Sequence, residues 1–243
     1  MSNISVLRFH RVDQFVHFFN LVCWLILIVS GLAIDNASRQ GVEPTHAYVG
    51  LHFISGFALT VLLLSYFVLA QSRAKRLFHE IFRSDRPFWS WLLRLGYYPQ
   101  KCAQRMGIKC PHIQTIPQGR YNAGQKLAYG TLVLMNFLLI ASGFGMFFLH
   151  SPNETSVAYD AMLGLHSLAF SVASLMLLMH IPMALTAPAY LKAIIPGTSG
   201  VVKQTTAQAH APLWVAEDLE LKGIDKFKSA QNPDGLCLLE KPL

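Results

Sequence analysis

The sequence contains little charge for its length. Asp, Glu, Lys and Arg make up 14% of its 243 residues, whereas 53% of the residues are hydrophobic. A soluble domain carries about 25% charged residues, which cover its water-facing surface. This composition excludes an ordinary soluble globular domain.

The hydrophobic residues are gathered into four long runs, at about residues 14–34, 47–70, 126–149 and 161–186. Each run is long enough to cross about 30 Å of hydrocarbon as a helix. No run contains Asp or Glu in its interior, and none shows the alternating pattern of a barrel strand. Because a bilayer cannot satisfy an open strand edge, the runs predict an all-α protein, a four-helix transmembrane bundle.

Lys and Arg are distributed unevenly between the connecting segments. Of the 20 Lys and Arg residues, Arg39 is the only one in the first or third loop between the runs. Cationic loops stay in the cytoplasm, so we predict that both termini and a long loop at 71–125 are cytoplasmic in a bacterial inner membrane. We divide the chain into a membrane domain at 1–190 and a cytoplasmic tail at 191–243. Topology thus explains the net charge of +7 without a nucleic-acid partner, and a basic surface also attracts anionic membrane lipid.

The long loop and the tail are less apolar than the four runs. The segment at 86–100, RPFWSWLLRLGYYPQ, interleaves Arg with aromatic residues, which predicts a short helix on the inner leaflet. The tail has several prolines, so we expect it to extend over a partner or to remain partly disordered. Cys102 and Cys110 face a reducing compartment in this topology and predict neither a disulfide nor a zinc site.

Four of the ten histidines lie within the apolar runs, and these are His17, His52, His166 and His180. An ionisable side chain is costly inside a membrane and is by default a functional candidate. Successive runs cross the membrane in opposite directions. His17 and His180 are therefore expected near the cytoplasmic face, and His52 and His166 near the outer face. The other six histidines are expected at helix ends or in cytoplasmic segments.

The spacing of His166 and His180 places both on one face of the fourth helix. Fourteen residues make four turns less about 40° and rise about 21 Å. Two imidazoles fill both axial positions of a haem iron and leave none for oxygen chemistry. Two pairs at two depths therefore predict two haems, one held by His52 and His166 and the other by His17 and His180. A proton relay in a transporter or a haem-free anchor is the alternative, and the runs lack the carboxylates that a relay usually has.

Several motifs resemble the cytochrome b (gamma) subunit of membrane-bound formate dehydrogenases, within the wider superfamily of di-haem membrane cytochromes b. The most specific is Tyr-Asn-Ala-Gly-Gln-Lys at 121–126, directly before the third run. The resemblance covers about residues 8–215. The other matching segments surround the four histidines or lie in the tail, and they are DQFVHFF, GLHFISG, LGLHSLAF, LMLLMHIPMA and AHAPLW.

This resemblance implies two haem b groups with the same histidine pairing. It also implies that menaquinone is reduced near the cytoplasmic haem, with Asn122 and Gly124 as quinone contacts. Gln125 and Lys126 lie beside them, where the free N–H groups of a helix start offer further donors. The alternative role for Asn122 is to cap the third helix.

The resemblance further implies an iron–sulfur beta subunit on the outer side and, through it, a molybdenum or tungsten catalytic alpha subunit. Electrons would pass from that side through the outer and inner haems to the quinone. The chain itself shows no catalytic constellation for formate oxidation. The alternatives are the cytochrome b subunit of another periplasmic enzyme, such as a hydrogenase or a thiosulfate reductase, or a free-standing di-haem oxidoreductase linked to quinone.

Overall fold

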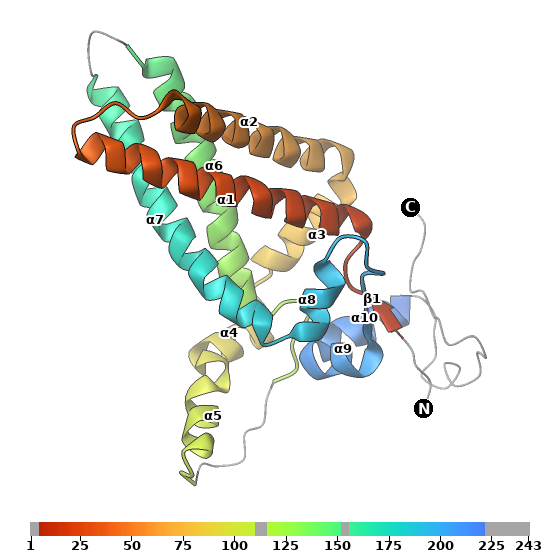
Figure 1. Ribbon diagram of the computed structural model, residues 1–243. Coiled ribbons are helices and arrows are strands. Elements are labelled where there is room, and N and C mark those ends of the chain that lie inside the picture. The colour runs from red at the N-terminus through yellow and green to blue at the C-terminus, as the bar shows by residue number, and fades with distance from the viewer. Residues whose placement is uncertain (1–4, 110–115, 152–155, 222–243) are drawn as a thin grey trace.

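The computed structural model describes residues 5–109, 116–151 and 156–221 (Figure 1). It contains four long apolar helices, each of which is long enough to span a membrane: α1 (Arg11–Arg39), α2 (His46–Leu69), α6 (Ala123–Leu149) and α7 (Val157–Leu185). The predicted all-α fold with four spanning helices is confirmed. Each helix begins one to four residues before its hydrophobic run. At the start of α1, the Asp13 carboxylate accepts a hydrogen bond from the backbone N–H of His10.

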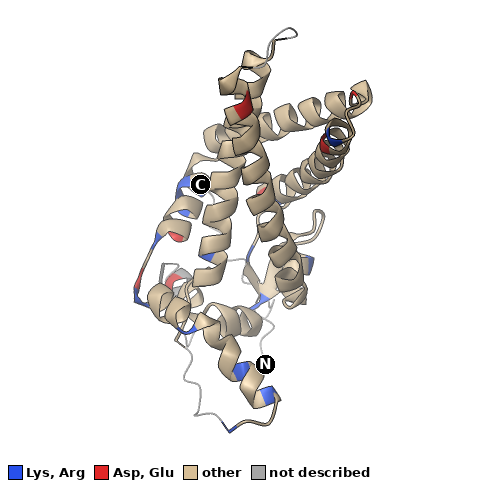
Figure 2. Ribbon diagram, turned by 90° about the vertical axis from the view of Figure 1, so that its left-hand side faces the viewer, with Lys and Arg blue, Asp and Glu red and all other residues tan. Residues whose placement is uncertain are grey.

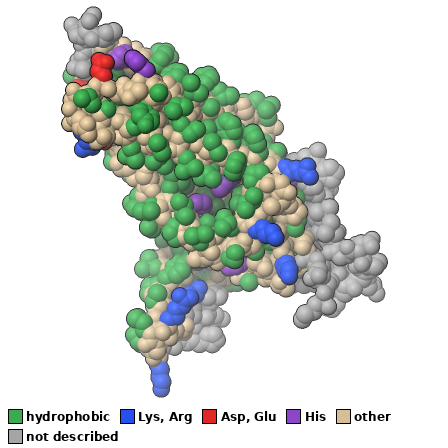
Figure 3. Space-filling model, in the orientation of Figure 1, with side chains coloured by type: hydrophobic (Ala, Val, Ile, Leu, Met, Phe, Trp, Pro, Cys, Tyr) green, Lys and Arg blue, Asp and Glu red, His purple; other side chains and the backbone are tan. Residues whose placement is uncertain are grey.

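The four helices form two antiparallel hairpins, because α1 packs along α2 and α6 packs along α7. Figures 1 and 2 together show that the hairpins cross at an angle. They meet at a small apolar core formed by Cys23, Trp24, Leu59 and Ala173. Most large apolar side chains of the helices face outward (Figure 3), and the helices are almost free of charge along their length (Figure 2). Such a surface suits lipid rather than water.

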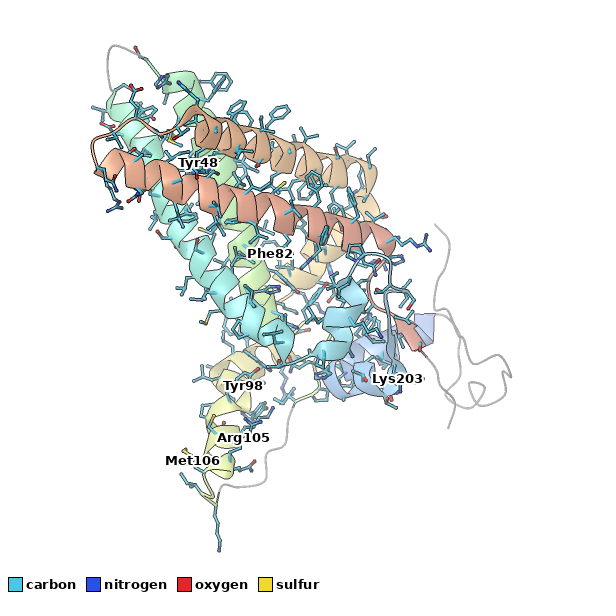
Figure 4. The ribbon with its side chains drawn as sticks, in the orientation of Figure 1. Tyr48, Phe82, Tyr98, Arg105, Met106 and Lys203 are labelled. Carbon is cyan, nitrogen blue, oxygen red and sulfur yellow. The ribbon has the colours of Figure 1, made fainter. Side chains whose placement is uncertain are left out.

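The described part of the segment between the hairpins contains several short helices, and α4 is the short helix that the aromatic and basic pattern at 86–100 predicts. It contains α3 (Gln71–Phe82), α4 (Arg86–Leu93), a 3-10 turn η1 (Leu95–Tyr97) and α5 (Tyr98–Arg105). The Asp85 carboxylate caps α4 by accepting a hydrogen bond of 3.1 Å from the backbone N–H of Phe88. α4 packs against α6, whereas α5 projects away from the bundle (Figure 4).

Both ends of the described chain meet in one compact unit, which we call the terminal module. Strand β1 (Ser5–Leu7) pairs antiparallel with β2 (Val201–Lys203), so that Val6 lies opposite Val202. Around them lie α8 (Pro188–Ile194), α9 (Gln204–His210) and α10 (Pro212–Leu221). Its buried core consists of Val6, Ala193, Val202, Ala207, Ala211, Trp214 and Val215.

Up to residue 221 the tail is folded, which differs from the expectation of an extended or partly disordered segment there. Strand β2 of the tail pairs with β1, and apolar residues of the tail pack against Val6 of β1. Neither strand would be stable alone. The chain after residue 221, with Cys237, lies outside the described residues, as do Cys110 and His112. Cys102 is a free, exposed thiol. The division of the chain at residue 190 stays a prediction.

Candidate functional site

The four membrane histidines lie in two facing pairs. The ring centroids of His52 on α2 and His166 on α7 are 6.2 Å apart. Those of His17 on α1 and His180 on α7 are 6.4 Å apart. Each pair thus joins the first hairpin to α7, and histidine side chains are visible within the apolar face of the bundle (Figure 3).

These separations fit two imidazoles on one metal ion. A coordinating nitrogen lies about 2.0 Å from the metal and about 1.2 Å from its own ring centroid, so two opposed rings have centroids about 6.4 Å apart. Among the described residues, no group of three or more His, Cys, Asp or Glu side chains gathers as a metal site. Two opposed histidines leave the remaining positions to a macrocycle, as in a bis-histidine haem.

A buried serine orients the ring of His52. Ser30, on the neighbouring helix α1, is 1% exposed, and its Oγ lies 2.9 Å from Nδ1 of His52. The Ser30 hydroxyl also donates to the carbonyl oxygen of Ile26 at 2.7 Å. Because a hydroxyl carries one hydrogen and that of Ser30 is directed to Ile26, we assign Nδ1–H of His52 as the donor and Oγ of Ser30 as the acceptor. The unprotonated Nε2 is then the nitrogen available to a metal.

The second hairpin repeats this arrangement. Ser142 on α6 is fully buried, donates to the Leu138 carbonyl at 2.6 Å, and has its Oγ 3.0 Å from Nδ1 of His166. Each serine is followed by a glycine close to the ring: a Cβ on Gly31 or Gly143 would lie 3.2 Å or 3.6 Å, respectively, from Cε1 of the nearby histidine. In each hairpin, a Ser-Gly pair on the first helix therefore contacts the histidine ring on the second helix.

The Tyr-Asn-Ala-Gly-Gln-Lys motif forms the start of α6. Asn122 and Gln125 form a capping box: Oδ1 of Asn122 accepts from the Gln125 backbone N–H at 2.9 Å, and Oε1 of Gln125 accepts from the Asn122 N–H at 3.1 Å. The capping role is thus present. The side-chain amide N–H groups of both residues make no hydrogen bond within the described chain, so they are available to a ligand.

Gly124 and Lys126 connect the motif to α4. A Cβ on Gly124 would lie 2.7 Å from Cη2 of Trp91, so the indole packs directly over the glycine. Lys126 is 6% exposed, and its Nζ donates to the Arg83 carbonyl at 2.7 Å. Its ammonium also lies 5.9 Å from the ring centroid of Phe88. Lys126 is therefore engaged in holding the α3–α4 turn, whatever else it contacts.

The segment that contains Arg8 is hydrogen-bonded to Arg120, directly before the motif at 121–126. The guanidinium of Arg8, which is 4% exposed, donates to the Arg120 carbonyl at 2.8 Å, and Arg120 donates back to the Arg8 carbonyl at 3.0 Å. Burial, followed by repulsion from Arg120, lowers the pKa of Arg8. Four aromatic rings surround the Arg8 guanidinium, and they belong to Phe9, Tyr121, Tyr190 and Trp214.

Comparison with known proteins agrees with the paired histidines. The model of the family described as "Prokaryotic cytochrome b561" matches residues 8–197. The chain belongs to this prokaryotic cytochrome b561 family. It is also similar to the cytochrome b556(Fdn) subunit of nitrate-inducible formate dehydrogenase from Escherichia coli (strain K12), E. coli O157:H7 and Shigella flexneri. Each relative is 25% identical over 223 residues, which are 87% of this chain and 91% of the relative.

As a member of the cytochrome b561 family, the protein is an integral membrane cytochrome b that transfers electrons, and its cofactor is haem b. The predicted resemblance to a formate dehydrogenase cytochrome b subunit is confirmed. The two pairs of imidazoles, with ring centroids 6.2 Å and 6.4 Å apart, fit such a group. Sequence reasoning missed Ser30 and Ser142. The shared signal was a Ser-Gly dipeptide at 30–31 and 142–143, each inside an apolar run.

Proposed function

We propose that this chain is the di-haem electron-transfer subunit of a formate dehydrogenase-like complex and that it reduces quinone near the cytoplasmic face. The observation that carries the proposal is the presence of two opposed histidine pairs on one bundle. His52 and His166 would be the axial ligands of one haem b, and His17 and His180 those of the other. A haem bound in this way passes single electrons and has no open position for other chemistry.

The orientation follows from the charges. Lys and Arg gather at the end of the bundle that carries α3 to α5 and the terminal module (Figure 2), and such residues stay in the cytoplasm. We therefore infer that the α1–α2 and α6–α7 loops, and the His52–His166 pair near them, face the outer side of a bacterial inner membrane. An iron–sulfur subunit, and a molybdenum or tungsten catalytic subunit beyond it, would dock there. The named relatives are themselves subunits of a formate dehydrogenase.

The start of α6 is the proposed quinone site, with menaquinone as the substrate. The capping box uses the side-chain oxygens of Asn122 and Gln125, which leaves their N–H2 groups to donate to a quinone carbonyl. Gly124 and the indole of Trp91 over it form an apolar wall beside these donors. Lys126 donates to the Arg83 carbonyl, so we assign it a role in supporting this wall, and its predicted contact with the quinone stays a prediction.

Haem content per polypeptide tests the first part of the proposal. We expect two haems b in the purified wild-type protein and one in His180→Ala. A variant lacking both members of a pair, His17 and His180, should still bind one, whereas loss of His17 and His52 together should abolish both. His46→Ala is the matched control, because His46 is an exposed histidine at the start of the helix that carries His52. No haem in folded wild-type protein, or haem loss that ignores the pairing, would overturn the assignment.

Asn122→Asp tests the quinone site without removing the helix cap. Asp caps a helix as well as Asn does, but it lacks the amide donor and adds negative charge. We expect the KM for a menaquinone analogue to rise about fivefold or more, the effect of losing a hydrogen bond of about 1 kcal/mol. Asn36→Asp is the matched control, because it makes the same chemical change at an exposed residue near the C-terminal end of α1. An unchanged KM in Asn122→Asp would refute the contact.

A further inference from the structure

The two histidine pairs differ in how their rings are held. Nδ1 of His52 and Nδ1 of His166 each lie within hydrogen-bond distance of a buried serine Oγ, at 2.9 Å and 3.0 Å, and a backbone carbonyl of the serine's helix, Leu27 or Leu139, also lies beside each ring. Neither His17 nor His180 makes a hydrogen bond with any residue that the structure describes. The interplanar angles of the rings also differ, at 60° for the outer pair and 42° for the inner pair. The two sites are thus built from the same ligands but with different supports.

We propose that Ser30 and Ser142 are positioning residues that hold the reduction potential of the outer haem below that of the inner haem. This inference rests on the proposed di-haem function. It adds a direction to that function, since an electron then moves downhill from the outer pair to the inner pair.

The physical reason is the donation of the ring N–H. An imidazole that donates Nδ1–H to an acceptor becomes a more basic ligand through Nε2. A more basic ligand stabilises the oxidised, more positive iron and so lowers the reduction potential. Both axial ligands of the outer pair are supported in this way, and neither ligand of the inner pair is.

The serines are committed to this role by their other hydrogen bonds. Each hydroxyl donates its one hydrogen to a backbone carbonyl of its own helix, Ile26 for Ser30 and Leu138 for Ser142. We therefore assign the ring N–H as the donor and each serine oxygen as the acceptor. With Ser30 1% and Ser142 0% exposed, water does not replace the hydroxyl freely. The hydrogen bonds also fix which ring nitrogen faces the iron.

The test is a redox titration of Ser30→Ala, Ser142→Ala and the double variant, followed by the haem absorbance. The outer haem is isolated by repeating each titration in a His180→Ala background. We expect the wild-type outer haem to have the lower potential of the two. Each serine-to-alanine change should raise the equilibrium constant for reduction of the outer haem by up to about tenfold. This corresponds to a rise in its reduction potential of about 59 mV for a one-electron couple. The inner haem should keep its potential.

Ser174→Ala is the matched control. Ser174 lies on α7 between the two histidines of that helix, and its buried Oγ has no hydrogen-bond partner among the described residues. This variant should leave both potentials unchanged. Electron paramagnetic resonance of the oxidised protein gives a second readout, because freeing the ring of His52 or His166 should shift the outer low-spin signal alone.

The outcomes separate this inference from the proposed function. Two haems whose potentials do not change in the alanine variants, or change equally at both sites, would overturn the role of the serines and leave the di-haem function standing. A wild-type protein without haem would overturn both.

Discussion

Lys126 offers a test that separates a structural role from a direct contact with quinone. Its Nζ is buried and donates to the Arg83 carbonyl at 2.7 Å, next to the ring of Phe88. Lys126→Met keeps the length and the apolar stem of the side chain but removes the charged donor. The carbonyl at the end of α3 then loses its partner. We expect α4 to separate from α6 more often, and Trp91 to leave Gly124 with it.

The size of the effect follows from the kind of bond. A hydrogen bond from a charged group contributes about 1.5–3 kcal/mol. Because α4 is a short helix at the edge of the bundle, this loss should appear as local opening rather than global unfolding. An energy of this size raises the opening equilibrium constant about 10- to 150-fold.

Hydrogen exchange with mass spectrometry measures that opening directly. Amides at 83–98 should exchange faster in Lys126→Met, while those of α1, α2 and α7 should not change. Lys203→Met is the control, because Lys203 is an exposed lysine on the terminal module (Figure 4). Faster exchange at 83–98 together with a raised KM for quinone is the expected pattern. Normal exchange with a raised KM would refute the structural role and make Lys126 a direct quinone contact.

Three further changes test the supports of the site. Gly124→Val should push Trp91 away, at a cost of about 1–3 kcal/mol, and a red shift of tryptophan fluorescence should report the exposed indole; unchanged fluorescence would count against the packing. Gly200→Ala should loosen the β1–β2 pair, because Gly200 has a φ of +71° and a Cβ there would overlap the Phe9 carbonyl. Protease cleavage between α8 and β2 should become faster. An unchanged rate of cleavage would contradict the clash. Burial raises the pKa of Tyr190, so the folded module retains the phenol proton. The contribution of the neutral Tyr190 to stability is present below about pH 10, the ordinary tyrosine value. This contribution is lost as pH rises through the raised pKa. Tyr190→Phe should remove that loss in proteolysis measured from pH 8 to 11, and a profile identical to the wild type would refute it.

The membrane helices could be predicted from the sequence because the bilayer imposes one simple requirement. A backbone inside hydrocarbon must satisfy its own hydrogen bonds, so a long apolar run has one solution. The pairing of the histidines followed from the same requirement, since alternate crossing directions fix their depths. His52 with His166 and His17 with His180 are the pairs that the structure brings together.

The supports of the site were harder to predict because they depend on packing between distant segments. Ser30 and His52 are 22 residues apart, and Lys126 contacts a carbonyl 43 residues away. Serine in a membrane helix usually bonds its own backbone, and both serines do so. Only the neighbouring helix shows that the oxygen has a second use. The folded tail was missed for the same reason, since its core is completed by Val6 at the other end of the chain.

The arrangement of serines and histidines also indicates how the His52–His166 pair is held in place. Ser30 and His52 belong to the first hairpin, and Ser142 and His166 belong to the second. Each hairpin therefore orients its own ligand through contacts between its own two helices. The inner ligands have no such support within the described chain. They lie toward the end of the bundle where the terminal module and the motif at 121–126 pack together through Arg8 and Arg120. The His52–His166 pair is thus supported within each hairpin, whereas the His17–His180 pair has no side-chain hydrogen bond within the described residues.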